Sequence, residues 1–246
     1  MATHMDSLAE KKCVVTGASK GMGKSIALAL ASEQAKLCLV GREMQTLEEV
    51  ARTARATSSL VTCFSADLTS SVRIAELSQY VEQDFGGIDI LVNCAGIYSR
   101  GDLGKTPVKE MDRAYETNVR APFVLTQSLL PVLKERAGQI VFINSPQAVH
   151  PSPSVGFYAA SQHALKAITD VLRQEVNEAG VRVLTIYPGR TATPRMEAIF
   201  RIEGKPYHPE VLLQPEDVAA MVIHSLKLPR TAEVTSIHLR PMKKSY

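Results

Sequence analysis

Thr16-Gly17-Ala18-Ser19-Lys20-Gly21-Met22-Gly23 joins a short apolar run, Cys13 to Thr16, to a helical pattern that begins at Met22. Because glycine has no side chain, backbone amides at such a turn can approach a phosphate group closely. The start of the following helix adds partial positive charge. The stretch therefore predicts a strand-turn-helix unit that holds a phosphate-bearing ligand.

The chain on both sides of this turn alternates short β-branched runs with longer helical patterns, which is typical of repeated βαβ units. Seven strands are expected: Cys13–Thr16, Lys36–Val40, Leu60–Ser65, Ile88–Asn93, Gln139–Asn144, Val181–Tyr187 and Glu233–Leu239. The expected helices are Met22–Glu33, Glu43–Ala54, Ser70–Phe85, Val108–Glu135 (as two helices), Tyr158–Glu178 and Pro215–Leu226. This order predicts an α/β fold, a single doubly wound Rossmann domain with a seven-stranded, mainly parallel sheet.

Two segments fall outside that alternation. Residues 1–10 are polar, and we expect an N-terminal extension that is disordered or a remnant of cloning, with the domain spanning 11–246. Residues 189–214 combine prolines, glycines and large apolar side chains, and they form a candidate lid over a substrate, or else a packed surface excursion. Pro107, Pro131 and Pro215 are expected where helices begin or end.

Composition limits the possible partners. The net charge is only +3, and basic and acidic residues are interspersed, so neither nucleic-acid nor membrane binding is expected. No stretch predicts a signal peptide or a transmembrane helix. The four cysteines, Cys13, Cys38, Cys63 and Cys94, lie in or just after separate strands without metal-ligand spacing, so free thiols, no metal site and a cytoplasmic location are expected.

The glycine-rich turn has a second interpretation. Gly23-Lys24-Ser25 resembles the end of a nucleoside-triphosphate P-loop, in which Lys24 would contact phosphates and Ser25 would hold magnesium. Ala18 stands where that pattern requires its first glycine, and no acidic partner for magnesium is evident at a later strand end. The dinucleotide interpretation is therefore favoured over the P-loop.

The spacing Gly-x-x-x-Gly-x-Gly resembles the short-chain dehydrogenase/reductase family, and further matches extend over nearly the whole chain. Asp67-Leu68 resembles its adenine-contacting pair, Asn93-Cys94-Ala95-Gly96 its Asn-Asn-Ala-Gly turn, and Pro188-Gly189 with Thr193 its nicotinamide-contacting turn. The resemblance implies the following cofactor-binding residues: Gly17, Ser19, Lys20, Gly21, Met22, Gly23, Arg42, Asp67, Leu68, Asn93, Ala95, Gly96, Tyr158, Gln162, Pro188, Gly189, Thr191 and Thr193.

The end of the second strand indicates which dinucleotide is preferred. An NAD site generally places a carboxylate there for the ribose 2′-hydroxyl, whereas this strand ends Val40-Gly41-Arg42. Arg42 can pair with a 2′-phosphate through its planar guanidinium, and Lys20 can add a second positive charge. The sequence therefore favours NADP(H) over NAD(H).

The catalytic residues follow from the same resemblance. Ser145, after the fifth strand, and Tyr158, thirteen residues later, match the family's serine and tyrosine, which implies that Ser145 orients the substrate oxygen and Tyr158 exchanges its proton. Asn118 resembles the helix asparagine that helps hold a relay water. The inferred reaction transfers a hydride to or from a small carbonyl or secondary alcohol.

One position departs from the family pattern. Four residues after the tyrosine the family places a lysine, whose charge lowers the tyrosine pKa, but here that position is Gln162. We expect Gln162 to keep hydrogen bonds to ribose, to weaken alcohol oxidation most, and to leave reduction favoured. Lys166, one turn farther on, is expected to lie at the surface and not to replace the missing lysine. His163 is expected to be a packing or a surface residue.

Three further expectations complete the interpretation. The alternative to an enzyme is a catalytically impaired NADP(H)-binding protein that senses cofactor or assists assembly. A hydrolase built on Ser145 and His150 is disfavoured because the Gly-x-Ser-x-Gly elbow is missing. Helices 119–135 and 158–178 carry apolar residues on more than one face, which suggests a homo-oligomer, a dimer or a tetramer.

Overall fold

The computed structural model describes residues 5–243, and within them one sheet of seven strands runs through the molecule. Its spatial order is β3-β2-β1-β4-β5-β6-β7, and every neighbouring pair is parallel. The strands are β1 (Lys12–Thr16), β2 (Lys36–Gly41), β3 (Val61–Ser65), β4 (Ile90–Asn93), β5 (Gln139–Ile143), β6 (Arg182–Pro188) and β7 (Ser236–Leu239). The order reverses between β1 and β4, so the prediction of a doubly wound Rossmann domain is confirmed.

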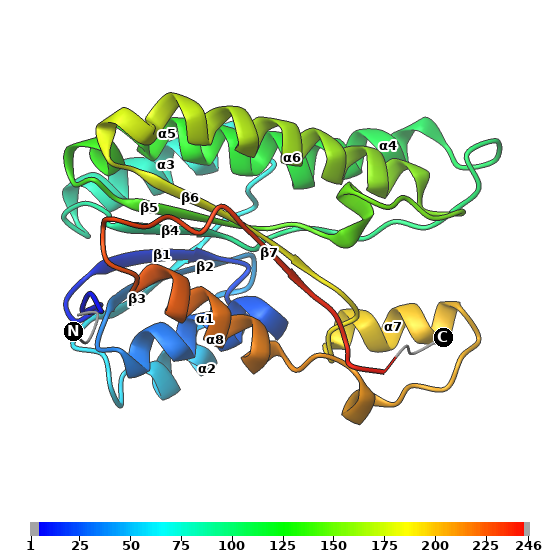
Figure 1. Cartoon of the computed structure of the whole chain (residues 1–246), viewed down its shortest axis with the longest axis horizontal. Coiled ribbons are helices and arrows are strands. Elements are labelled where there is room, and N and C mark those ends of the chain that lie inside the picture. Colours follow the sequence, from blue (N-terminus) through cyan, green and yellow to red (C-terminus); the bar gives the residue numbers. More distant parts are fainter. Residues whose placement is uncertain (1–4, 244–246) are drawn as a thin grey trace.

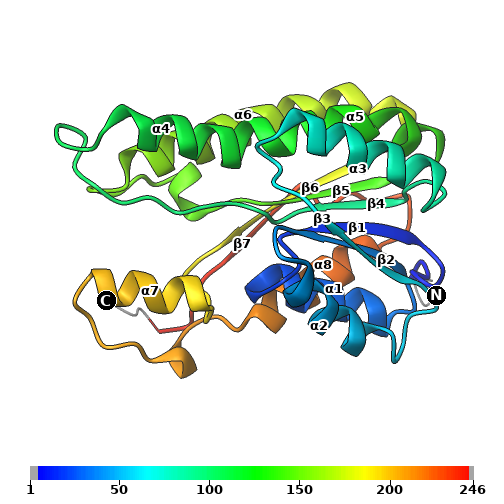
Figure 2. The same cartoon turned by 180° about the vertical axis from the view of Figure 1, so that it is seen from behind.

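Helices cover both faces of this sheet, as Figures 1 and 2 show from opposite sides. One layer holds α1 (Gly21–Ser32), α2 (Met44–Ala54) and α8 (Pro215–Leu226). The other layer holds α3 (Ser71–Gln83), α4 (Val108–Tyr115), α5 (Ala121–Glu135) and α6 (Gly156–Val176). A further helix, α7 (Pro194–Ile202), stands apart from both layers at one end of the molecule.

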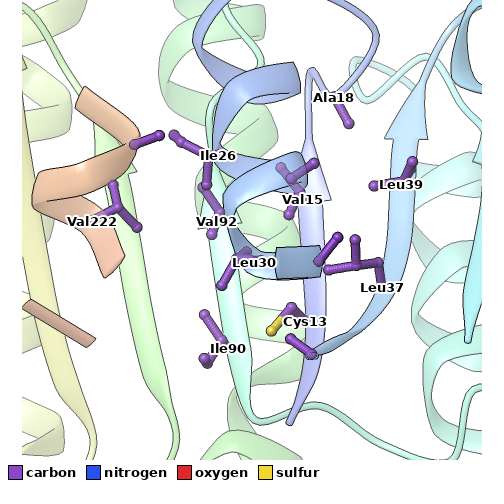
Figure 3. Close-up of a cluster of buried hydrophobic side chains, with 14 of the residues drawn as sticks. Cys13, Val15, Ala18, Ile26, Leu30, Leu37, Leu39, Ile90, Val92 and Val222 are labelled. Atoms are coloured by element: carbon purple, nitrogen blue, oxygen red, sulfur yellow. The ribbon is translucent and has the colours of Figure 1, made fainter. Parts of the chain in front are cut away.

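The burial of the strands explains why their sequences are uninterrupted apolar runs. Strands β1 and β4 lie at the middle of the sheet and are buried on both faces, so both sets of alternating side chains must be apolar. Beneath α1, Ile26 and Leu30 pack with Val222 of α8 against Val15 and Val92 (Figure 3). A second cluster fills the space between the sheet and the layer of α3, α5 and α6. Both layers are therefore fixed relative to the strand ends.

The expected helical region, Val108–Glu135, is confirmed as two helices, α4 and α5. Between α4 and α5 the chain makes a π-helical turn, Glu116–Arg120, so the two helices are continuous with one widened turn rather than separated by a loop. The expectation that Pro131 marks a helix end is wrong, because it lies inside α5. Pro131 and Gln127, whose carbonyl loses its amide partner, are both exposed, so water can solvate that carbonyl. Pro107 and Pro215 do mark helix starts.

Three boundary expectations also need correction. Helix α6 begins at Gly156, so Tyr158 lies within its first turn rather than opening it. The 189–214 segment is not an irregular loop throughout, since it contains α7, which the prolines in that segment obscured. Of the N-terminal extension, residues 1–4 lie outside the described residues, but Leu8 is 2% exposed and packs in the core, so this part belongs to the domain.

Candidate functional site

The carboxyl ends of the middle strands surround a cavity of about 580 Å³. Parallel strands end at one edge of a sheet, so Asn93 of β4, Ser145 after β5 and Gly189 after β6 come together there. The α6 side chains Tyr158 and Gln162 face the same cavity. The structure therefore gathers every residue that the sequence analysis expected to be catalytic, because Asn118 also lines this space.

A second hollow of about 340 Å³ runs from the glycine-rich turn to the ends of β2 and β3. Its lining includes Gly17, Ser19, Lys20, Gly21, Gly23, Arg42, Asp67 and Leu68. Met22, Cys94, Ala95, Gly96, Thr193 and Arg195 line both hollows. The two are therefore adjoining parts of one elongated groove. Of the other expected cofactor-binding residues, Asn93, Pro188, Gly189 and Thr191 line the larger part.

The glycine-rich turn has the geometry that a diphosphate cradle requires. Gly17 and Gly21 have φ angles of +66° and +56°, which L side chains rarely adopt. A Cβ atom on Gly23 would lie 2.2 Å from the Gly17 carbonyl oxygen, so no larger residue fits without moving the backbone. The turn leads directly into the N-terminus of α1, whose free amides and partial positive charge suit a phosphate.

The Thr16 hydroxyl joins the two parts of the groove. It donates to the Val92 carbonyl at 3.2 Å and accepts from the amides of Cys94 and Ala95 at 3.0 and 3.1 Å. The side chain is 1% exposed, so these bonds are shielded from water. The position of the turn after β1 is thereby fixed to the loop after β4, which lines both parts.

The far end of the smaller hollow carries opposite charges. Arg42 and Lys20 are exposed there, and no carboxylate follows β2 directly. Hydrogen bonds from the Thr69 amide and hydroxyl hold the pKa of Asp67 below its usual range, with a smaller contribution from the Arg42 charge. Asp67 is thus a fixed anion that can accept hydrogen bonds, and Arg42 remains free to pair with an anionic group.

Ser145 is held by its own neighbours. Its backbone amide donates to Asn144 Oδ1 at 2.6 Å, and Asn144 Nδ2 donates to the Gln162 carbonyl at 3.2 Å. Its hydroxyl accepts from the Gln147 amide at 3.2 Å. Asn144 therefore fixes the end of β5 to helix α6, and with it the relation between Ser145 and Tyr158. The sequence analysis did not identify this role, although Asn144 immediately precedes Ser145.

Tyr158 sits against another aromatic ring. Its ring centroid lies 5.0 Å from that of Tyr98, edge to face. Burial raises the pKa of the Tyr158 phenol, while the Ser145 hydroxyl and the charge of Arg195 act in the opposite direction and Tyr98 adds to the rise. Because the net direction is upward, Tyr158 is a neutral phenol at neutral pH and can donate a proton. Sequence reasoning missed both Tyr98 and Arg195.

Gln162 is 4% exposed and supplies no charge to this phenol. Lys166 does not replace the missing cation, because its ammonium is bound to Asp170 Oδ2 at 2.6 Å on a half-exposed face. His163 directs Nδ1 to the Ala159 carbonyl at 2.9 Å. Both side chains thus have the surface and packing roles expected of them, and neither lines the cavity.

Asn118 lies in the π-helical turn and is 3% exposed. Its Oδ1 accepts from the Ile97 amide at 2.8 Å, and its Nδ2 donates to the Ile97 carbonyl and to Ser161 Oγ, both at 3.1 Å. The carboxamide thereby connects the loop after β4 to helix α6. Widened turns of this kind often occur at functional sites, because they redirect one side chain without ending the helix.

The two alternative enzymes are not supported by the geometry. Lys24 and Ser25 do not line the groove, and Ser25 Oγ instead donates to Glu216 of α8 at 2.9 Å. His150 is exposed and does not line the cavity that holds Ser145. The P-loop interpretation is therefore wrong, and the pairing of Ser145 with a histidine that a hydrolase needs is not formed in the described part of the chain.

The cavity also contains a group of charges that the sequence did not reveal. Arg190 Nη2 donates to both Glu203 oxygens at 2.9 and 3.2 Å, Arg100 Nη1 donates to one at 3.2 Å, and Lys205 Nζ lies 3.5 Å away. We call Arg100, Arg190 and Lys205, which meet at Glu203, the cation cluster. Glu203 is 8% exposed, and burial raises its pKa, but the hydrogen bond and charge of Arg190 and the other cations outweigh this and lower it.

Three other features of the described residues concern thiol reactivity, metal binding and membrane spanning. Burial raises the pKa of Cys94 to about 11, so this thiol, which lines the groove, is protonated at neutral pH and a weak nucleophile. Among residues 5–243 no three histidine, cysteine or acidic side chains are grouped as metal ligands would be. The described helices also include none with the length and hydropathy needed to cross a membrane.

Comparison with known proteins gives consistent matches. The family model described as short chain dehydrogenase matches residues 11–203. Uncharacterized oxidoreductases of Staphylococcus epidermidis and Staphylococcus aureus are each 32% identical over 239 residues, which cover 97% of this chain and 100% of theirs.

Two solved structures have nearly the same fold. An alcohol dehydrogenase from the archaeon Thermococcus sibiricus, complexed with 5-hydroxy-NADP, superposes with a TM-score of 0.85 at 27% identity, covering 96% of this chain and 99% of that one. L-Sorbose reductase from Gluconobacter frateurii, complexed with NADPH and L-sorbose, gives 0.86 at 26% identity, covering 96% and 97%.

Proposed function

The chain belongs to the short chain dehydrogenase family, and from this premise we propose that it is an NADP(H)-dependent oxidoreductase acting on a small carbonyl compound or secondary alcohol. One observation carries the proposal: Ser145 and Tyr158 line a cavity that adjoins a glycine-lined, cation-bearing groove. Similar proteins of known structure hold NADP or NADPH, which supports the same dinucleotide here.

The residues present fit this cofactor. The cradle of Gly17, Gly21 and Gly23 at the start of α1 would hold the diphosphate, and Arg42 with Lys20 would pair with the 2′-phosphate. Asp67 would accept hydrogen bonds from the adenine end, and Thr193 stands beside the larger cavity to bind the nicotinamide end. When bound, the cofactor supplies or accepts the hydride.

The chain's own residues supply the proton and position the substrate. Ser145 would donate a hydrogen bond to the substrate oxygen, and Tyr158 would transfer its phenolic proton to that oxygen as negative charge develops on it. Burial raises the pKa of Tyr158, so the phenol is protonated at neutral pH. Reduction needs this protonated phenol as its acid, whereas oxidation needs the phenolate as its base. We therefore propose that reduction of a carbonyl is the favoured direction.

Gln162 lowers the expected catalytic power. It stands where the resemblance places a lysine, and its carboxamide brings no charge to stabilise the Tyr158 phenolate. Arg195, exposed at the start of α7, is the cation that acts on this phenol. The burial of Gln162 without a charge also favours a second candidate function, an NADP(H)-binding protein with impaired catalysis.

Two further proposals concern the whole molecule. Segment 189–214 contributes Met196, Ile199 and Glu203 to the lining of the cavity. The Ala192 amide donates to the Leu213 carbonyl and the Leu213 amide donates to the Arg190 carbonyl, and these two backbone bonds fix the base of the segment. It is therefore a candidate lid. Phe123 of α5 and Val171 of α6 are 43% and 53% exposed, which supports a homo-oligomer formed through these helices.

The proposed function is tested by two measurements on one protein. NADPH fluorescence on titration reports binding, and NADPH consumption with a panel of ketones and aldehydes reports turnover. We expect NADPH to bind more tightly than NADH, and we expect slow reduction that Tyr158→Phe abolishes while binding persists. Binding without turnover by either the original or Gln162→Lys would favour the binding protein. Failure to bind either dinucleotide would refute both candidates.

A further inference from the structure

The cavity that holds Ser145 and Tyr158 has an excess of positive charge in its lining. Among the described residues that line it, Arg100, Arg190, Arg195 and Lys205 are cations and Glu203 is the only acid. Arg100, Arg190 and Lys205 all interact with Glu203, and this one carboxylate cannot neutralise three cations. The remaining charge therefore attracts an anion into the cavity, most strongly where walls of low dielectric surround it.

The cation cluster keeps free hydrogen-bond donors. An arginine has five N–H donors, and Arg100 uses one of them on Glu203. Arg190 uses only Nη2 on that carboxylate, and its Nη1 is buried without any partner. Because a buried donor without a partner is costly, an additional acceptor is expected at this place.

The guanidinium of Arg190 is held ready for such an acceptor. It lies over the Phe200 ring, 4.7 Å from the centroid, and Phe200 is 4% exposed. Arg100 and Lys205 are 36% and 40% exposed, so their remaining donors can be reached. One rigid cation and two accessible ones thus converge on Glu203 in the lining of the cavity.

Part of the cavity wall is apolar. Ile97, Val155, Met196 and Ile199 contribute to it, next to the ring of Tyr98. A cavity of about 580 Å³, part of which the nicotinamide end of a cofactor would occupy, suits a short aliphatic chain. The lining thus combines hydroxyl groups, apolar surface and cations.

From the presence of these groups in one cavity we propose that the substrate is an anionic carbonyl compound, with its carbonyl at Ser145 and Tyr158 and a carboxylate or phosphate ester at the cation cluster. This inference rests on the proposed function and specifies its substrate class. Glu203 then acts as an internal competitor that holds the cations in place until the substrate anion joins them. It is a positioning residue and does not touch the reacting atoms.

The test compares matched charged and neutral ligands on the complex saturated with NADPH, by calorimetric titration. One arm uses 4-oxopentanoate, 5-oxohexanoate and 6-oxoheptanoate against their methyl esters, and the other uses hydroxyacetone phosphate against hydroxyacetone. We expect at least tenfold tighter binding of the anion in one arm, and the responding arm identifies the anion. A preference below tenfold in both arms overturns the inference.

Three variants separate charge from folding. The double variant Arg100→Gln with Lys205→Gln should reduce the preference at least tenfold, and Arg201→Gln, an 80% exposed cation of the same segment, should leave it unchanged. Glu203→Gln should tighten anion binding, which a purely structural carboxylate would not do. If NADPH itself fails to bind, the proposed function fails; if NADPH binds and the neutral ligands bind equally well, only this inference fails.

Discussion

Replacing Gln162 by lysine is the sharpest test of how Tyr158 works. The two residues lie four positions apart on α6, which places them about 6 Å apart along the helix axis. For a separation of ~6 Å between the lysine ammonium and the Tyr158 phenolate oxygen, and an effective dielectric constant near 20, the ammonium stabilises the phenolate by about 2.8 kcal/mol. This energy corresponds to roughly a hundredfold larger phenolate fraction at fixed pH.

The expected result is asymmetric between the two directions. Burial raises the pKa of Tyr158, so at neutral pH the phenolate that oxidation needs is scarce and the added charge increases its supply. Oxidation of a secondary alcohol by Gln162→Lys should accelerate up to about a hundredfold at pH 7, and its pH profile should move to lower pH. Reduction should change much less, because the neutral phenol is already the main form.

The assay measures both directions with NADP⁺ and NADPH between pH 6 and 10, with NADPH fluorescence to confirm binding. Gln162→Met is the matched control, since it has similar volume and no charge and should not accelerate oxidation. An unchanged ratio of oxidation to reduction in Gln162→Lys, with NADPH binding intact, would refute the assignment of Tyr158 as the titrating acid and base.

Three other predictions follow from described contacts. Arg42→Ala should weaken NADPH binding by about tenfold to a hundredfold and leave NADH binding nearly unchanged, as measured by fluorescence titration, because it removes a cation facing the 2′-phosphate. Gly23→Ala should abolish binding of both dinucleotides, since the new Cβ would lie 2.2 Å from a carbonyl oxygen; retained affinity would contradict the cradle. The lowered pKa of Glu203 implies stability that is fully present above its unfolded pKa and lost as pH falls through the folded value, so Glu203→Gln should flatten the acid side of a plot of melting temperature against pH.

The sequence was sufficient for the fold because its signals are local. Apolar runs such as those around Val15 and Val92 identify buried parallel strands, and glycine spacing identifies the first turn. Segment boundaries were harder to predict, since Pro194 indicated a loop where the chain forms α7. Proline is favoured in a first helical turn, so the same residue type marks both structures.

Candidate site residues could be predicted only where they belong to a motif with a recognisable spacing. Ser145 and Tyr158 come from a recognisable interval, and the strand ends bring them together. Arg100 and Glu203 are 103 residues apart, and their contact depends on how the loop after β4 meets the end of α7. Nothing in their local sequence distinguishes these charges from solvated surface residues, so the cation cluster required the three-dimensional structure.

The widened turn at Asn118 sets a constraint on how this chain can vary in length. A π turn contains one residue more than an α turn, so deleting Arg120, which lies between Asn118 and α5, would let the helix regularise and gain local stability. The same deletion would rotate all that precedes it by about 100° relative to α5 and pull the carboxamide away from Ile97 and Ser161. A shortened version should therefore fold well and yet lose the alignment of its cavity walls.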